Sequence, residues 1–147
     1  MTEWQSDWES PDALIETLNQ HFEGWQDVGQ LIAVDYKAAT TRLVPQPMHL
    51  RLGNTVSGPA MFAMADVCMY LAIIWTLGPE AAASVTADMH SRFLRRPPGD
   101  QPLICKARLI RVGRNLIVAE AMAHAEGDEE PLALFTASYS NPTGVKV

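Results

Sequence analysis

The first third of the chain changes from a helical to a strand-like hydrophobic pattern. Segment 10–12 reads Ser-Pro-Asp, which joins a capping side chain to a proline and an acid suited to a first helical turn. Apolar residues then recur at helical spacing, which predicts an amphipathic helix over residues 11–24. Apolar and β-branched residues predict two strands at 31–34 and 40–44, and a loop follows over 45–54.

The middle of the chain carries its most apolar segment. From residue 58 to residue 75, apolar side chains occupy all sides of a helical wheel, and Gly78-Pro79 ends the pattern. Such a segment predicts a helix that protein surrounds on most sides. Four further segments have strand character and are separated by turn-forming residues: Ala83–Leu94, Leu103–Val112, Leu116–Ala125 and Pro131–Ser140.

This order of elements predicts an α+β fold in one domain over residues 1–147. An antiparallel sheet of five or six strands wrapped around the long central helix satisfies every burial requirement. The four C-terminal strands are expected to pair in succession as a meander. A strand that precedes the helix is expected to join them through a longer connection.

One carboxylate, Asp66, interrupts the apolar helix. Burying a carboxylate costs several kcal/mol unless it is paired or hydrogen-bonded. A fold tolerates this cost more readily when the group has a chemical role, which makes Asp66 the first candidate for catalysis. The alternative is that Asp66 pairs with a nearby Ser, Thr or Arg and only fixes a subunit interface.

Composition and residue spacing argue against several kinds of partner. The 147 residues carry a formal net charge of −6, and the sequence pI is about 5.1, so we expect no nucleic-acid partner. The spacing of the four histidines and two cysteines gives no metal site, and Cys68 and Cys105 are expected to be buried thiols. Asp66 argues against a membrane span, no signal peptide is expected, and a cytoplasmic location follows.

The stretch from Asn54 to Asn141 resembles the phenylacetate-degradation type of hotdog thioesterase, within the acyl-CoA thioesterase superfamily. In that family a His-Gly-Gly loop precedes the helix, and an acid lies eight residues after the first glycine. Gly58 and Asp66 keep this spacing, whereas Ser57 replaces the histidine and Pro59 replaces the second glycine. The other matching segments are Gly53–Pro59, Met64–Asp66, Val85–Asp88, Phe93–Pro97 and Arg111–Arg114.

The resemblance implies a hotdog fold and a role for each matching residue. Asp66 would be the general base or nucleophile, the Gly58 amide would polarise the thioester carbonyl, and Thr86 would orient water. Ser57 is a further catalytic candidate through its place in the motif. Candidate substrate-binding residues, the arginines among them suited to the phosphates of coenzyme A, are Asn54, Val56, Arg95, Arg96, Gly113 and Arg114.

Ordinary structural roles compete with these assignments. Gly58 suits a helix start, Thr86 suits a strand, and the arginines could form a solvated basic face. Eight residues of helix place Gly58 and Asp66 about 12 Å apart, too far to act on one carbonyl within one chain. The resemblance resolves this distance by pairing subunits, so a homodimer is expected, either alone or joined with a second one as a dimer of dimers.

The resulting hypothesis is an acyl-CoA thioesterase that releases a medium-chain or aromatic acid and coenzyme A. It needs no cofactor, because coenzyme A is part of the substrate. The alternative, motivated by Ser57 and Pro59, is a hotdog protein that binds acyl-CoA without hydrolysing it.

Overall fold

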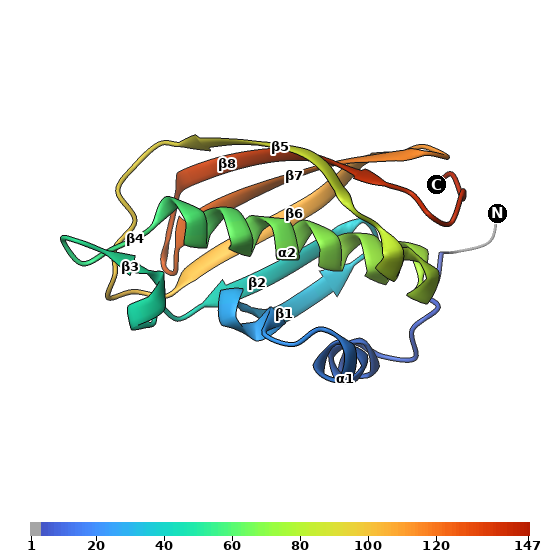
Figure 1. Ribbon diagram of the computed structural model, residues 1–147, viewed down its shortest axis with the longest axis horizontal. Helices are drawn as coiled ribbons and strands as arrows, with labels where there is room; N and C mark the ends of the chain where they lie inside the picture. The colour runs from blue at the N-terminus through green and yellow to red at the C-terminus, as the bar shows by residue number, and fades with distance from the viewer. Residues whose placement is uncertain (1–3) are drawn as a thin grey trace.

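The computed structural model describes residues 4–147, so residues 1–3 of the predicted domain lie outside the described chain. Figure 1 shows a long helix lying across one face of a sheet, with a shorter helix beside the first strand. The elements are, in chain order, α1 (Pro11–His21), the 3-10 helix η1 (Trp25–Val28), β1 (Gln30–Asp35), β2 (Ala38–Leu43), the 3-10 helix η2 (Pro47–His49), β3 (Leu50–Arg51), β4 (Thr55–Val56), α2 (Gly58–Leu77), the 3-10 helix η3 (Pro79–Ala83), β5 (Thr86–Phe93), β6 (Leu103–Val112), β7 (Leu116–Ala125) and β8 (Asp128–Ser140).

Local capping defines both helices: the cap at Ser10 and the stop at Gly78 are predicted from the sequence, whereas Ser57, a catalytic candidate there, is the N-cap of α2. The Ser10 hydroxyl oxygen accepts a hydrogen bond from the Ala13 amide at 3.1 Å, and α1 begins at the next residue, Pro11. The Ser57 hydroxyl oxygen accepts one from the Ala60 amide at 3.2 Å. At the other end of α2, Gly78 has φ 92°, a backbone angle that favours glycine.

The sheet confirms six antiparallel strands around one helix, but one predicted pairing is wrong. The strand order is β1-β2-β6-β7-β8-β5, so β5 pairs with β8 and not with the next strand, β6. β6 pairs instead with β2, which precedes α2 in the chain. The connection over residues 94–102 therefore crosses to another part of the sheet, and β5 becomes an edge strand with mostly exposed side chains.

The core lies between α2 and the sheet. α2 contacts all six strands, and Cys68 and Cys105 are buried free thiols, as predicted. Along β7 and β8, small buried residues on the inner face alternate with outward-facing side chains. The small residues let the helix pack closely against the sheet. These small residues are Ala119, Ala121, Ala123, Ala133 and Ala137.

Protein covers most sides of α2, as predicted, and one side remains open. By length and composition α2 could cross a membrane, yet 61% of its most apolar 18-residue stretch is buried inside the described fold. The uncovered stripe repeats every three or four residues, and Asp66 within it is half-buried. Its exposed or half-buried members are Pro59, Phe62, Ala63, Asp66, Val67 and Tyr70.

Several boundaries differ from the sequence prediction: α1 ends at His21 and not at residue 24, and β8 begins at Asp128 and not at residue 131. Two further differences involve short turns. Residues 79–83 form η3, so β5 begins at Thr86 and not at residue 83. The predicted loop before α2 contains η2 and the β3–β4 hairpin, which lies near the start of the helix in Figure 1. Both segments contain short turns that proline and glycine stabilise, and strand periodicity does not detect such turns.

Candidate active site

Asp66 is held by two hydroxyl groups, one from the edge strand β5 and one from its neighbour β8. Thr86, the first residue of β5, donates a hydrogen bond from Oγ1 to Asp66 Oδ1 at 2.9 Å. The Tyr139 hydroxyl on β8 lies 2.7 Å from the same oxygen and 3.1 Å from the Asp66 carbonyl oxygen. Oδ2 has no donor among residues 4–147, so one carboxylate oxygen is fixed and the other is free.

Tyr139 is a stable proton donor in this arrangement. Its side chain is 1% exposed, and this burial raises the pKa of the Tyr139 phenol far above its ordinary value. The negative charge of Asp66 and the hydrogen bond to it raise the pKa of the phenol further. Tyr139 therefore stays protonated and orients the Asp66 carboxylate.

A cavity of about 310 Å³ lies beside Asp66. Phe22, Val67 and Tyr70 supply apolar surface, while Thr86 and Tyr139 lie on the carboxylate side. Ser84 also lines the cavity, and its hydroxyl has no hydrogen-bond partner within the described chain. The space can therefore take a mainly apolar group next to the free carboxylate oxygen.

The start of α2 offers a single free amide. Pro59 has no N–H, the Ala60 amide donates to the Ser57 hydroxyl oxygen, and the Met61 amide donates to the Ser57 carbonyl oxygen at 3.1 Å. The Gly58 amide has no acceptor among residues 4–147. The two departures from the family motif, Ser57 and Pro59, thus leave Gly58 as the free donor at the positive end of the helix.

Gly58 lies in a second, separate cavity of about 440 Å³. Val56, buried at 2% exposure, lines this cavity, as do Arg51, Arg95 and Arg96. Asp66 is not part of its lining, in keeping with the helical distance of about 12 Å between the two residues. One chain therefore carries the predicted base, Asp66, and the predicted carbonyl donor, Gly58, in different cavities.

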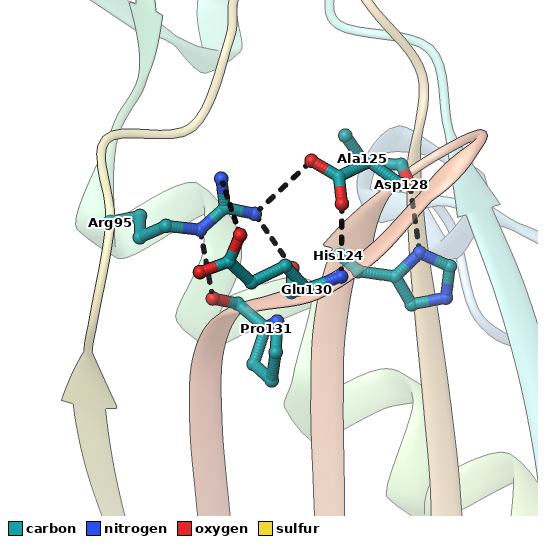
Figure 2. Close-up of polar contacts among 6 residues, drawn as sticks. All are labelled: Arg95, His124, Ala125, Asp128, Glu130 and Pro131. Carbon is teal, nitrogen blue, oxygen red and sulfur yellow. Dashed lines mark hydrogen bonds and ion pairs between the residues drawn. The ribbon is translucent and has the colours of Figure 1, made fainter.

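The arginines of this cavity are not equivalent. Figure 2 shows the Arg95 guanidinium turned toward the start of β8, where Nη2 donates to the Glu130 carbonyl oxygen at 2.7 Å and Nε to the Pro131 carbonyl oxygen at 3.2 Å. Arg95 also lies 3.5 Å from an Asp128 carboxylate oxygen and 3.9 Å from one of Glu130. Exposed Arg96 donates to the Gly53 carbonyl oxygen at 2.8 Å, with no acid among its described partners. These contacts favour Arg96 over Arg95 as a phosphate ligand.

The remaining predicted binding residues are spread along the fold. Gly113 and Arg114 line a third cavity of about 370 Å³ at the β6–β7 turn. Because Leu116 pairs with Ser140 whereas Phe93 pairs with Ala133, this turn lies at the opposite end of the sheet from Arg96. Asn54 occupies a turn with φ 52° and lines none of these three cavities.

Sequence reasoning missed several residues of these cavities. Tyr139 and Phe22 are far from Asp66 in the chain, and Arg51 lies in the predicted loop over residues 45–54. For Tyr139 a signal was present, because a buried tyrosine usually places its hydroxyl on a partner. No three His, Cys, Asp or Glu side chains among residues 4–147 gather as a metal site would require.

Comparisons with known proteins identify the family of the chain. The family model of the thioesterase superfamily matches residues 53–132, more than half of the chain. A Silicibacter protein that carries the provisional name thioesterase is 36% identical, with 94% of each chain covered and a TM-score of 0.83. The comparison with curated proteins gives no match.

More distant structures share the fold. The PaaI protein of the Escherichia coli phenylacetic acid degradation operon is 15% identical, with 86% of this chain and 89% of that chain covered and a TM-score of 0.73. A hypothetical thioesterase from Streptococcus pneumoniae, solved with coenzyme A, is 17% identical, with coverages of 80% and 88% and a TM-score of 0.70. The protein therefore belongs to the thioesterase superfamily and has its hotdog fold.

Proposed function

We propose that the protein is an acyl-CoA thioesterase that hydrolyses a medium-chain or aromatic acyl-CoA to the free acid and coenzyme A. Membership of the thioesterase superfamily supports thioester hydrolysis as the reaction class. The observation that carries the proposal is the Asp66 carboxylate, which is oriented through Oδ1 and free at Oδ2 beside an apolar cavity. A coenzyme A complex of a distant hotdog relative supports the nature of the leaving group.

In the proposed reaction Asp66 acts as a general base. Its Oδ2 takes a proton from a water molecule as the water oxygen attacks the thioester carbonyl carbon. The Gly58 amide of the second protomer donates to the carbonyl oxygen, where negative charge develops. When the tetrahedral intermediate collapses, the carbon–sulfur bond breaks, and the proton passes from Asp66 to the departing thiolate of coenzyme A. Direct attack by the carboxylate is the alternative route that the same geometry permits.

The position of β5 supports a second copy as the source of that amide. Asp66 is hydrogen-bonded to Thr86, at one end of β5. Gly58 lies next to Phe93, at the other end of β5, because a Cβ added to Gly58 would lie 3.4 Å from the Phe93 ring. An exposed edge strand readily pairs with another strand. If two copies of β5 pair antiparallel about a two-fold axis, Thr86 of one protomer lies opposite Phe93 of the other. Asp66 of one protomer then faces Gly58 of its partner, and each pair contains two complete sites.

The same pairing would gather the basic residues. Arg96 lies at the Phe93 end of its protomer, whereas Gly113 and Arg114 lie at the Thr86 end. An antiparallel pair brings these two ends together from different protomers. Guanidinium groups bind phosphate oxygens through charge-assisted hydrogen bonds, so this end of the paired site suits the nucleotide of coenzyme A.

The test of the reaction is release of free thiol from a panel of acyl-CoA thioesters. The wild-type protein should release coenzyme A, and Asp66→Asn should lower kcat by about 10²- to 10⁴-fold while it still binds substrate. The amide oxygen of Asn still accepts hydrogen bonds from the two hydroxyls, so the fold should be retained. Near-wild-type kcat in Asp66→Asn excludes the assigned role, and binding without thiol release by the wild type indicates an acyl-CoA-binding protein instead.

The shared site has its own test through mixed pairs. Asp66→Asn and Gly58→Pro chains should each be nearly inactive alone. After unfolding and refolding together, about half of the pairs are mixed, and each mixed pair has one intact site, so about a quarter of wild-type activity should return. Refolding the Asp66→Asn chain alone is the control. No recovery in the mixture, with pairs demonstrated by sedimentation, contradicts a site built from two chains.

A further inference from the structure

The cavity beside Asp66 is bounded by a residue from outside the segment shared with the family. Phe22 follows the last turn of α1, whereas the family match covers residues 53–132. The ring lines the cavity together with Tyr70 of α2, and the two ring centroids lie 6.2 Å apart in an edge-to-face arrangement with an interplanar angle of 73°. The N-terminal helix thus adds an aromatic side chain to the site.

The position of Phe22 is fixed from both sides. Before it, Leu14 and Leu18 anchor α1 in the core, and the Phe22 amide donates to the Leu18 carbonyl oxygen at 2.7 Å. After it, Trp25 is 2% exposed, and its indole N–H donates to Asn19 Oδ1 at 2.9 Å. The Phe22 ring is 37% exposed and its chain neighbours are exposed too, but buried Leu18 and Trp25 hold the segment at both ends, so the ring can act as a wall.

The two cavities differ in polarity. Three arginines line the cavity that contains Gly58, whereas no basic residue is present in the described lining of the cavity beside Asp66. The Asp66 carboxylate would also repel phosphate there. The nucleotide of a thioester therefore belongs with the arginines. The acyl group belongs beside Asp66, where Phe22, Val67 and Tyr70 supply apolar contacts.

We propose that Phe22 is a specificity-determining residue, which with Tyr70 forms an aromatic wall that limits the length of the acyl group. The inference rests on the proposed function, because it assigns the acyl half of that site. The wall favours compact acyl groups, since a long unbranched chain meets the Phe22 ring. α1, outside the segment matched by the family, is then the element that adapts the common site to its own substrate.

The test compares kcat/KM over a series of saturated acyl-CoA thioesters of increasing chain length. Phe22→Ala should move the preferred length to longer chains, with a gain of about four-fold in kcat/KM for each additional buried methylene. The change should lie mainly in KM, because the wall contacts the acyl group and not the reacting atoms. Phe22→Trp should move the preference to shorter chains. Tyr36→Ala is the matched control, since Tyr36 is 41% exposed and contacts the Trp4 ring in a tilted arrangement outside the cavity.

Each outcome separates this inference from the function on which it rests. If the wild type hydrolyses the series and the profiles of Phe22→Ala and Phe22→Trp both coincide with that of Tyr36→Ala, the wall is refuted and the activity stands. If the wild type hydrolyses nothing, non-hydrolysable thioether analogues of the same series are titrated by tryptophan fluorescence. A shift of preferred length in Phe22→Ala then supports the wall in a binding protein, and equal Kd profiles refute it.

Discussion

Replacing Gly58 with proline would delete the proposed oxyanion donor with little other change. Proline lacks an amide N–H and is favoured at the first position of a helix. The preceding residue, Ser57, already has φ −70° and ψ 153°, the extended backbone that a following proline requires. The nearest atom to a Cβ at residue 58 is Cζ of Phe93 at 3.4 Å, which is close to ordinary van der Waals contact. The helix should therefore still form.

The expected magnitude follows from the number of donors at the start of α2. Gly58 has the only N–H there without an acceptor in the described chain, so no neighbouring amide can replace it. Loss of one oxyanion donor costs about 2.7–4 kcal/mol of transition-state stabilisation, or about 10²- to 10³-fold in kcat. Gly58→Ala adds a similar Cβ but keeps the N–H, and we expect a reduction of less than about 10-fold.

The assay is thiol release at saturating acyl-CoA, with thermal unfolding measured for both variants. The ratio of kcat between Gly58→Ala and Gly58→Pro isolates the amide, because both carry a side chain at the same place. If the two variants fold equally well and their kcat values agree within a few-fold, the Gly58 amide does not stabilise the oxyanion. In that event the mixed-pair experiment would also need another inactive partner for Asp66→Asn.

Three further predictions concern the groups around the site. Tyr139→Phe should lower the free energy of unfolding by about 1–3 kcal/mol and kcat by about 10-fold or more, because Asp66 loses one of two orienting bonds. The control is Thr76→Val, which removes a buried α2 hydroxyl that accepts from the Lys37 amide between β1 and β2; it should lower stability alone. Arg96→Ala should raise KM about 5- to 10-fold, whereas Arg95→Ala should mainly lower the unfolding temperature, and the reverse result would contradict the assignment from their contacts. Because the pKa of the Tyr139 phenol is raised in the folded state, its stabilising contribution is present below about pH 10 and is lost above it, where the unfolded chain releases the proton. The free energy of unfolding, measured with denaturant between about pH 9 and 11, should fall less steeply with pH for Tyr139→Phe than for the wild type.

Much of the candidate site could be located from sequence because its anchors are local. Asp66 is conspicuous as a charge within an apolar helix, and Gly58 is defined by the cap and proline next to it. The prediction of Arg95 as a phosphate ligand could not take distant contacts into account. An arginine beside a turn suits phosphate, but the acids that surround this one, Asp128 and Glu130, come from a hairpin more than thirty residues later.

The sequence by itself determined the two α-helices, the six strands of the main sheet and which helix these strands fold around. Capping residues and alternating burial act over a few positions, so both helices and strands such as β6 and β7 begin and end near the predicted residues. Only the tertiary structure decided that β5 pairs with β8 at the edge of the sheet. That choice depends on which strands fill the positions around α2, a competition among segments far apart in the chain. It also places Tyr139 on Asp66 across 73 residues, a contact that no local pattern encodes.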